Sequence, residues 1–297
     1  MPSPTTEELH AKAVGLDQRP LAEVARILTD AQVGAAAVVQ SAIPAICDGA
    51  HLMAVALRGG GRLFYIGAGS SGLMAAADAL ELGGTFGVSS DRLRILMAGG
   101  LPNSPSMPGT TEDDTADLAA ALSDIGPGDV SIAVAASGTT PYTVNAATTA
   151  RARGAKVIGL ANNAGTPLLE VADVAILLQT PPEVLSGSTR LGAGTAQKIA
   201  LNTMSTLMGV RLGHVYDGMM VNLLADNDKL RRRAAGMVQK ITAADPDAAL
   251  EALNAAEGDV KLAVLIAAGQ VSLAAARDNL KDNNENLRGA LDRLRNA

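Results

Sequence analysis

The chain has few aromatic residues, a single cysteine and no excess of positive charge. Only 2% of its 297 residues are aromatic and none is tryptophan, so its core must be built from aliphatic side chains and close backbone contacts. With Cys47 as the only cysteine, an internal disulfide is excluded, which is typical of a reducing compartment. Because Cys47 lies in an apolar helical pattern, we expect a buried, inert thiol.

Charge and hydropathy exclude further classes of protein. The net charge of −6 argues against a nucleic acid partner, which would require a basic face. The longest apolar stretch, 199–210, contains Asn and Thr and is shorter than the roughly 20 residues that span a bilayer. The first ten residues lack the basic and apolar regions of a secretory signal. We therefore expect a cytoplasmic protein with no membrane partner. Since His10, His51 and His214 show no metal-like pairing, we expect no metal either.

The hydrophobic pattern predicts the fold class. Short β-branched or aliphatic runs occur at 62–66, 93–97, 130–135, 156–160 and 174–178. Helical patterns separate most of these runs, and this alternation is typical of a parallel sheet covered by helices on both faces. Helical spacing also covers about 6–57 and resumes at Leu191, unbroken almost to the end. We predict a three-layer α/β fold with a five-stranded parallel sheet. Its expected parts are N-terminal helices in 1–57, the sheet domain in 58–235 and a small helical subdomain in 236–297.

The loop after the first predicted strand, Gly67-Ala68-Gly69-Ser70-Ser71-Gly72, fits the dinucleotide pattern GxGxxG. That pattern also expects an acidic residue at the end of the second strand, but this strand ends Met97-Ala98-Gly99-Gly100. The free amides of a glycine loop at a helix N-terminus suit an anion instead. The alternative is that Ser70 and Ser71 merely cap the helix.

A second loop of the same kind follows the third predicted strand, with the sequence Ala136-Ser137-Gly138-Thr139-Thr140-Pro141-Tyr142. Neither loop contains Lys or Arg, and neither carries the GK[ST] motif of a nucleotide-binding P-loop. Two neighbouring crevices rich in hydroxyls and amides favour one phosphate monoester with a polar organic body. The predicted phosphate contacts are Ser70, Ser71, Ser137 and Thr140.

The paired loops GAGSS and ASGTT resemble those of the sugar isomerase (SIS) domain. The longer strings GGRLFYIGAGSSG, AASGTTPY, PPEVLSGSTRLGAGTAQK and LNTMST resemble the N-acetylmuramic acid 6-phosphate etherase family. Similarity extends from Thr6-Glu7 and LDQRPLAEVARILTDAQ to GDVKLAVLIA near the end, and so covers nearly the whole chain. The resemblance implies an SIS-type fold and a homodimer that uses no cofactor. The Ala-rich stretch 193–206 could serve the dimer contact or the core.

The resemblance also implies a reaction and its residues. Members of the family cleave the D-lactyl ether at C3 of the sugar phosphate by elimination and addition of water, in cell-wall recycling. Asp78-Ala79-Leu80-Glu81 aligns with the family's D-A-S-E and implies that Glu81 is the proton donor. Thr111-Glu112-Asp113-Asp114 aligns with A-E-D and implies that Glu112 is the second catalytic glutamate. Without the resemblance, both are ordinary helix-end charges. The implied substrate-binding residues are Ser70, Ser71, Ser137, Gly138, Thr140, Ser188, Arg190 and Lys198.

Three positions depart from the family pattern, with Leu73, Thr139 and Gly192 where the family usually has basic residues. A lactyl ether carries a carboxylate, for which Arg190 and Lys198 are the candidate partners. Two alternatives therefore stay open. One is a non-catalytic regulator that senses a sugar phosphate, and the other is a related lyase or isomerase acting on a different sugar phosphate.

Overall fold

A computed structural model describes residues 5–105, 111–223 and 228–296, which form two compact units. The first unit holds the described residues up to Leu80 together with those from Ser90 to Leu207. The second holds Glu81–Ser89 and the described residues from Met208 onward. The three-part division drawn from the sequence stays a prediction.

A five-stranded parallel sheet forms the centre of the first unit, in the order β2-β1-β3-β4-β5. The predicted α/β fold and strand number are confirmed. The strands are β1 (Leu63–Gly67), β2 (Leu93–Met97), β3 (Val130–Ala135), β4 (Lys156–Ala161) and β5 (Val174–Leu177). Both central strands β1 and β3 are buried along their whole length, as expected for strands covered on both faces.

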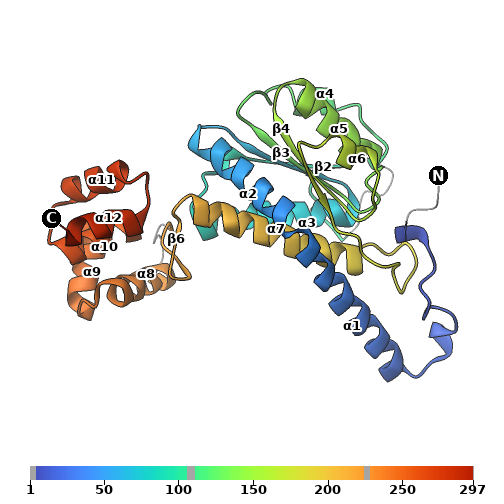
Figure 1. Ribbon diagram of the computed structural model, residues 1–297, viewed down its shortest axis with the longest axis horizontal. Helices are drawn as coiled ribbons and strands as arrows, with labels where there is room; N and C mark the ends of the chain where they lie inside the picture. The colour runs from blue at the N-terminus through green and yellow to red at the C-terminus, as the bar shows by residue number, and fades with distance from the viewer. Residues whose placement is uncertain (1–4, 106–110, 224–227, 297) are drawn as a thin grey trace. The chain divides into compact units, whose positions relative to one another are not determined.

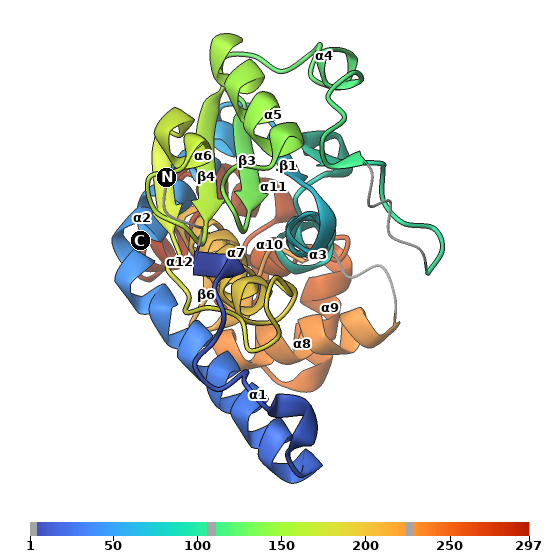
Figure 2. The same cartoon turned by 90° about the vertical axis from the view of Figure 1, so that its right-hand side faces the viewer.

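Helices cover the sheet on both faces, as Figures 1 and 2 show. One layer consists of α4 (Leu118–Ala121), α5 (Pro141–Ala152) and α6 (Pro167–Val171). Phe64 and Ile66 of β1 share a core cluster with residues of this layer. The other layer consists of α2 (Ile43–Arg58), α3 (Gly69–Phe86) and α7 (Gly192–Arg211). In this layer a small residue lets α2 and α7 pack closely, because a Cβ added to Gly49 of α2 would lie 2.5 Å from the Met204 sulfur of α7.

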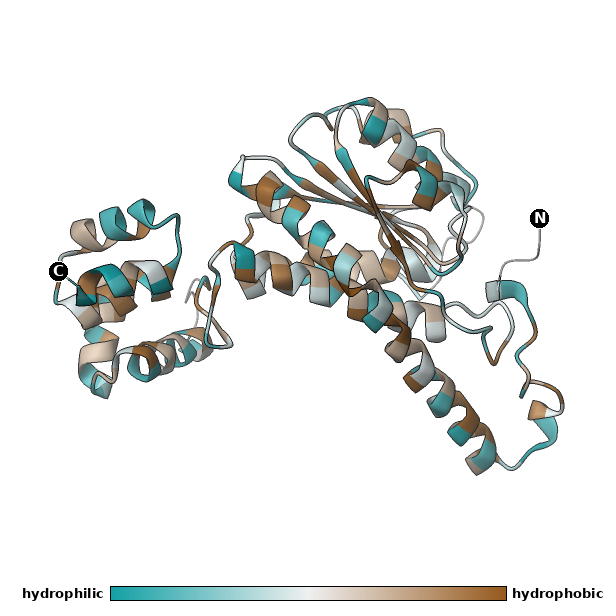
Figure 3. Ribbon diagram, in the orientation of Figure 1, coloured by the Kyte–Doolittle hydropathy of each residue, from teal (hydrophilic) through white to brown (hydrophobic). Residues whose placement is uncertain are grey.

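The N-terminal region contains η1 (Thr5–Glu7), η2 (Leu16–Gln18), α1 (Leu21–Ala37) and η3 (Val38–Ala42), which leads into α2. Among the described residues, the continuous helix Leu21–Arg58 is long and apolar enough to cross a membrane by length and composition, with a mean hydropathy of 1.4. The stretch 199–210, the longest apolar run in the sequence, lies within α7 and outside this helix. Figure 3 shows apolar and polar residues alternating along α1, whereas the strands are mostly apolar.

Cys47 is exposed, so the predicted buried thiol is wrong. The buried residues of α2 include Ile46, Gly49, Ala50 and Met53, which lie on one side of the helix. The helical period turns Cys47 away from that side. The apolar pattern was correct, but the face on which the cysteine lies was not.

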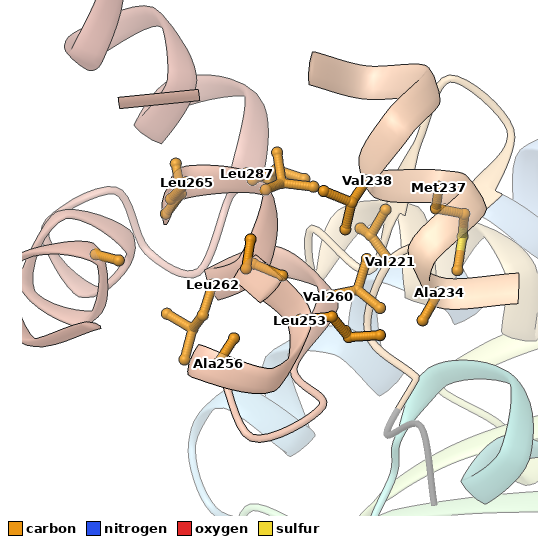
Figure 4. Packing of buried hydrophobic residues seen from close by; sticks show 14 of the residues in the cluster. Val221, Ala234, Met237, Val238, Leu253, Ala256, Val260, Leu262, Leu265 and Leu287 are labelled. Carbon is orange, nitrogen blue, oxygen red and sulfur yellow. The ribbon is translucent and has the colours of Figure 1, made fainter. Parts of the chain in front are cut away.

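A two-stranded antiparallel hairpin follows α7 in the second unit, so the helical pattern predicted from Leu191 onward is interrupted. Strands β6 (Val215–Tyr216) and β7 (Met219–Met220) are joined by Asp217 and Gly218, both with positive φ, as two-residue hairpin turns require. The helices that follow are α8 (Asp228–Thr242), α9 (Pro246–Ala255), α10 (Val260–Gly269), α11 (Leu273–Asp282) and α12 (Leu287–Arg295). Their aliphatic side chains form one core, which includes Val238, Leu253 and Val260 (Figure 4).

Candidate functional site

The first candidate loop connects the end of β1 to the start of α3, and the two elements pack closely against each other. A Cβ added to Gly67 would lie 2.8 Å from the Gly72 Cα, so the helix starts directly against the strand. Gly69 has a φ of 51°, which favours glycine. Ser70 is half-buried and Ser71 is buried. This geometry places the first amides of α3 at the carboxyl edge of the sheet, where parallel α/β folds bind ligands.

The second loop lies beside the first because β1 and β3 are neighbours, with Gly67 paired to Val134. The Ser137 hydroxyl accepts a hydrogen bond from the Thr139 amide at 3.1 Å and lies 3.3 Å from the Thr140 hydroxyl. Gly138 has a φ of 71° and is buried against Thr166. The Thr140 side chain precedes α5 but makes no capping hydrogen bond to it. The loop is therefore tightly turned, with hydroxyls that lie close together.

Glu112 joins the two loops. A Cβ added to Gly69 would lie 2.5 Å from Oε1 of Glu112, so only glycine leaves room for this carboxylate at the first loop. The Glu112 carbonyl accepts a hydrogen bond from the Tyr142 amide in the first turn of α5, at 3.0 Å. The side chain of Glu112 thus lies at the first loop and its backbone at the end of the second.

A cavity of about 370 Å³ opens at the end of β2, and its lining includes Thr111, the neighbour of Glu112 in the chain. Its polar lining comes from Thr111, Asp114, Asp117 and Tyr142, and none of the described residues that line it is Lys or Arg. Burial, followed by the charge of Asp117, raises the pKa of Tyr142 above its ordinary value. The cavity therefore offers carboxylates and a protonated phenol, and it is electrostatically unfavourable for a second anion.

Ser188 and Arg190 lie in a third loop, which connects β5 to α7. The loop is closed by Glu183, a buried residue whose two carboxylate oxygens accept hydrogen bonds from the amides of Gly192 (2.9 Å) and Ala193 (2.8 Å). A Cβ added to Gly192 would lie 3.1 Å from one of these oxygens. The amides at the start of α7 are thus already occupied by the protein's own carboxylate. No local sequence pattern indicates this role, because Glu183 lies nine residues before the helix.

A buried carboxylate holds α3, β1 and α7 together behind the first loop. Asp78 accepts hydrogen bonds from the Tyr65 hydroxyl (2.9 Å), the Asn202 amide (2.7 Å) and the Ser205 hydroxyl (2.9 Å). Burial, and then the Asp78 charge, raises the pKa of Tyr65 well above its ordinary value. The sequence marked Asp78 only as part of a motif, and its three donors come from positions that no local pattern connects.

The remaining predicted residues are exposed. Arg190 lies in the third loop and Lys198 on α7, both in the first unit. Glu81 belongs to the second unit, on the last turns of α3. The Ala-rich residues of α7, such as Ala193, Ala196 and Ala200, are buried within the first unit, which places them in its core. Within the described ranges there is no group of three His, Cys, Asp or Glu side chains arranged to hold a metal ion.

Comparison with known proteins supports the same fold class. Residues 26–162 match the SIS domain. The sugar isomerase domain of the RpiR transcription factor from Sphaerobacter thermophilus shares the fold, with 18% identity and a TM-score of 0.50 over 64% of this chain and 91% of that one. The protein is therefore an α/β protein of the SIS class.

Much closer relatives define the family. A protein named N-acetylmuramic acid 6-phosphate etherase from Deinococcus radiodurans is 47% identical over 265 residues, which cover 88% of this chain and 86% of the relative. One of the same name from Symbiobacterium thermophilum is 42% identical over 264 residues, covering 88% and 87%. The chain belongs to the N-acetylmuramic acid 6-phosphate etherase family.

Proposed function

We propose that this protein cleaves the D-lactyl ether of N-acetylmuramic acid 6-phosphate, giving N-acetylglucosamine 6-phosphate and D-lactate. The observation that carries the proposal is the position of Glu112. Its carboxylate lies against Gly69 of the first loop, and its backbone is bonded to the end of the second loop. A carboxylate held between two anion-binding loops is suited to proton transfer on a phosphorylated substrate.

The phosphate binds at the two neighbouring loops. Ser70, Ser71, Ser137 and Thr140 supply hydroxyls, and the first amides of α3 supply further donors. Gly138 shapes the second loop but its amide is already bonded to the Ala135 carbonyl at 3.1 Å, so its predicted contact with the substrate is not through a free amide. A phosphate held by neutral donors suits a monoester, whose charge is small enough to need no metal ion.

The reaction requires one base and one acid. When the sugar ring opens, the aldehyde makes the C2 proton acidic, and Glu112 removes it. Glu81 protonates the ether oxygen at C3 as the carbon–oxygen bond breaks, so that D-lactate leaves. Water then adds to the unsaturated intermediate at C3, its hydroxyl on C3 and its proton on C2, which restores the sugar. The carbon–oxygen bond that breaks at C3 is replaced by the one that water forms, and the accompanying proton transfers are ones that positioned carboxyl groups can perform.

The lactyl carboxylate is directed toward Arg190 and Lys198. The cavity at the end of β2 carries Asp114 and Asp117 and would repel it, so the lactyl group is expected on the side of the third loop.

Release of D-lactate from N-acetylmuramic acid 6-phosphate tests the function directly. Folded protein that binds the product but releases no lactate would instead be a sugar-phosphate-sensing regulator. Interconversion of an aldose and a ketose phosphate without lactate would identify an isomerase.

We further propose a cytoplasmic homodimer with no nucleic acid or membrane partner. The long N-terminal helix supports a partner copy, because it exposes Leu21, Val33, Ile43 and Val55. Light scattering at micromolar concentration tests this, and a mass of about 30 kDa, that of one chain, would contradict it.

A further inference from the structure

The first described residues of the chain lie at the carboxyl edge of the sheet. Figures 1 and 2 show η1 (Thr5–Glu7, dark blue) next to the ends of β3 and β4. Thr6 is only 1% exposed, although it belongs to a three-residue helix near the chain end. Such burial requires specific partners, and these come from residues more than 150 positions further along the chain.

Thr6 is bonded to the root of the second loop through Asn163. The Asn163 side-chain amide donates to the Thr6 hydroxyl oxygen at 3.2 Å and to the Ala136 carbonyl at 3.0 Å. Ala136 is the residue that leaves β3 and starts the second loop, and its carbonyl also accepts from the Asn162 amide at 3.0 Å. Because a carbonyl can only accept, the nitrogen of the Asn163 amide must face it. The other N–H of this buried amide is then satisfied by Thr6.

Glu7 contacts the third loop from the same helix. Its backbone carbonyl accepts from the Ser186 hydroxyl at 3.4 Å. A Cβ added to Gly187 would lie 3.6 Å from Oε2 of Glu7. One short turn at the N-terminus therefore touches both the loop with Ser137 and Thr140 and the loop with Ser188 and Arg190.

We propose that η1 positions the phosphosugar site, with Thr6 as the positioning residue that orders the second loop through Asn163. The physical reason is the absence of Lys and Arg from the first two loops. A site that binds phosphate through amides and hydroxyls depends on their being held in place before the ligand arrives, since disorder in the loop reduces the affinity. The effect on ligand affinity rests on the proposed function, whereas the ordering of the second loop does not.

The test compares Thr6→Val, Thr6→Ser and the matched control Thr5→Val. Valine keeps the β-branched shape and removes the hydroxyl acceptor, whereas serine keeps the hydroxyl. We expect Thr6→Val to raise the Kd for N-acetylglucosamine 6-phosphate about 5- to 10-fold, as the loss of one buried hydrogen bond implies. Thr6→Ser and Thr5→Val should stay within about 2-fold. With N-acetylmuramic acid 6-phosphate, KM should rise in Thr6→Val more than kcat falls.

A second readout separates this inference from the proposed function. Hydrogen exchange of the amides at 136–140 should be faster in Thr6→Val without any ligand, and unchanged in Thr5→Val. If the wild type binds no sugar phosphate, the proposed function fails while this readout still tests the positioning role. A lower melting temperature with unchanged exchange at 136–140 and unchanged Kd would overturn it, since Thr6 would then serve stability alone.

A double-mutant cycle tests the path through Asn163. Asn163→Ala, which also removes the bond to the Ala136 carbonyl, should weaken ligand binding at least as much as Thr6→Val does. The double variant should bind the ligand no more weakly than Asn163→Ala alone. If the two factors multiply, Thr6 does not act through Asn163. Should Thr6→Val not fold, Asn163→Ala probes the same hydrogen bond from its other side.

Discussion

The two compact units begin their helices in different ways. In the second unit, α9, α10, α11 and α12 each start at a residue whose side chain accepts a hydrogen bond from the helix: Asp245, Asp259, Ser272 and Asn286. In the first unit, α5 starts at Thr140, whose side chain makes no such bond. The start of α7 is occupied instead by the distant Glu183. Local side chains cap the helices of the second unit, whereas in the first unit distant groups occupy the helix starts: the Glu112 carbonyl accepts from the Tyr142 amide of α5, and Glu183 accepts from the start of α7.

The largest expected effect lies in the chemistry of the first unit. Glu112→Gln should lower kcat by about 10²–10⁴-fold, because glutamine is unable to take the C2 proton. Glu81→Gln should abolish turnover in the same way by removing the acid. Both variants should still bind N-acetylglucosamine 6-phosphate, which calorimetry can measure. Normal lactate release from either variant would remove that residue from the mechanism.

The next effect concerns the stability of the first unit. Asp78→Ala leaves the buried Tyr65 hydroxyl without its acceptor and removes the acceptor of the half-buried Asn202 amide, while Ser205 keeps only the Asn202 carbonyl, so the change should cost about 3 kcal/mol of unfolding free energy. Urea unfolding measures this loss. Asp114→Asn, at an exposed carboxylate, serves as the control and should change stability by less than about 0.5 kcal/mol. Equal losses in the two variants would argue against a structural role for the Asp78 network.

A matched pair of substitutions tests the comparison itself. Asp259→Ala removes a local cap and should cost about 1 kcal/mol of stability without a change in ligand affinity. Thr140→Ala has no cap to lose, so it should leave stability nearly unchanged and weaken binding of N-acetylglucosamine 6-phosphate. Urea unfolding measures the stability of each variant, and calorimetry measures its affinity for N-acetylglucosamine 6-phosphate. If Thr140→Ala lowered stability as much as Asp259→Ala and binding were intact, the proposed difference between the units would not hold.

The smallest effect is a pH dependence in the second unit. Burial lowers the pKa of Lys261, whose amine donates to the Glu285 carbonyl at 3.0 Å. The folded state therefore releases this proton at lower pH than the unfolded state does. Stability should rise as the pH increases through the folded pKa toward the ordinary value near 10.5, and this gain should disappear as the pH falls.

Lys261→Met keeps the length of the side chain and removes the charge. The difference in unfolding free energy between wild type and Lys261→Met should change with pH below the ordinary lysine pKa near 10.5, and the contribution of Tyr65 cancels because both proteins contain it. A constant difference over this range would show that the Lys261 proton is bound equally in both states.

Much of the fold was predictable because hydrophobic periodicity is local. The five strands lie within one or two residues of their predicted runs, and the two loops lie side by side because their strands pair. The hairpin after α7 was missed because a two-residue turn at Asp217 and Gly218 hardly alters a hydrophobic pattern. The exposure of Cys47 was missed because it depends on which side of α2 packs on the sheet.

By itself, the sequence determined the fold class, the five strand segments and the two hydroxyl-bearing loops. Each of these depends on residues within a few positions of one another. Only the tertiary structure brought Glu112 to Gly69, placed the Glu183 carboxylate on the start of α7 and joined Thr6 to Asn163. Each of these contacts spans between 9 and 157 positions along the chain. A contact between residues so far apart in the chain produces no periodic pattern in the sequence. It forms only when the folded sheet brings its loops together along one edge.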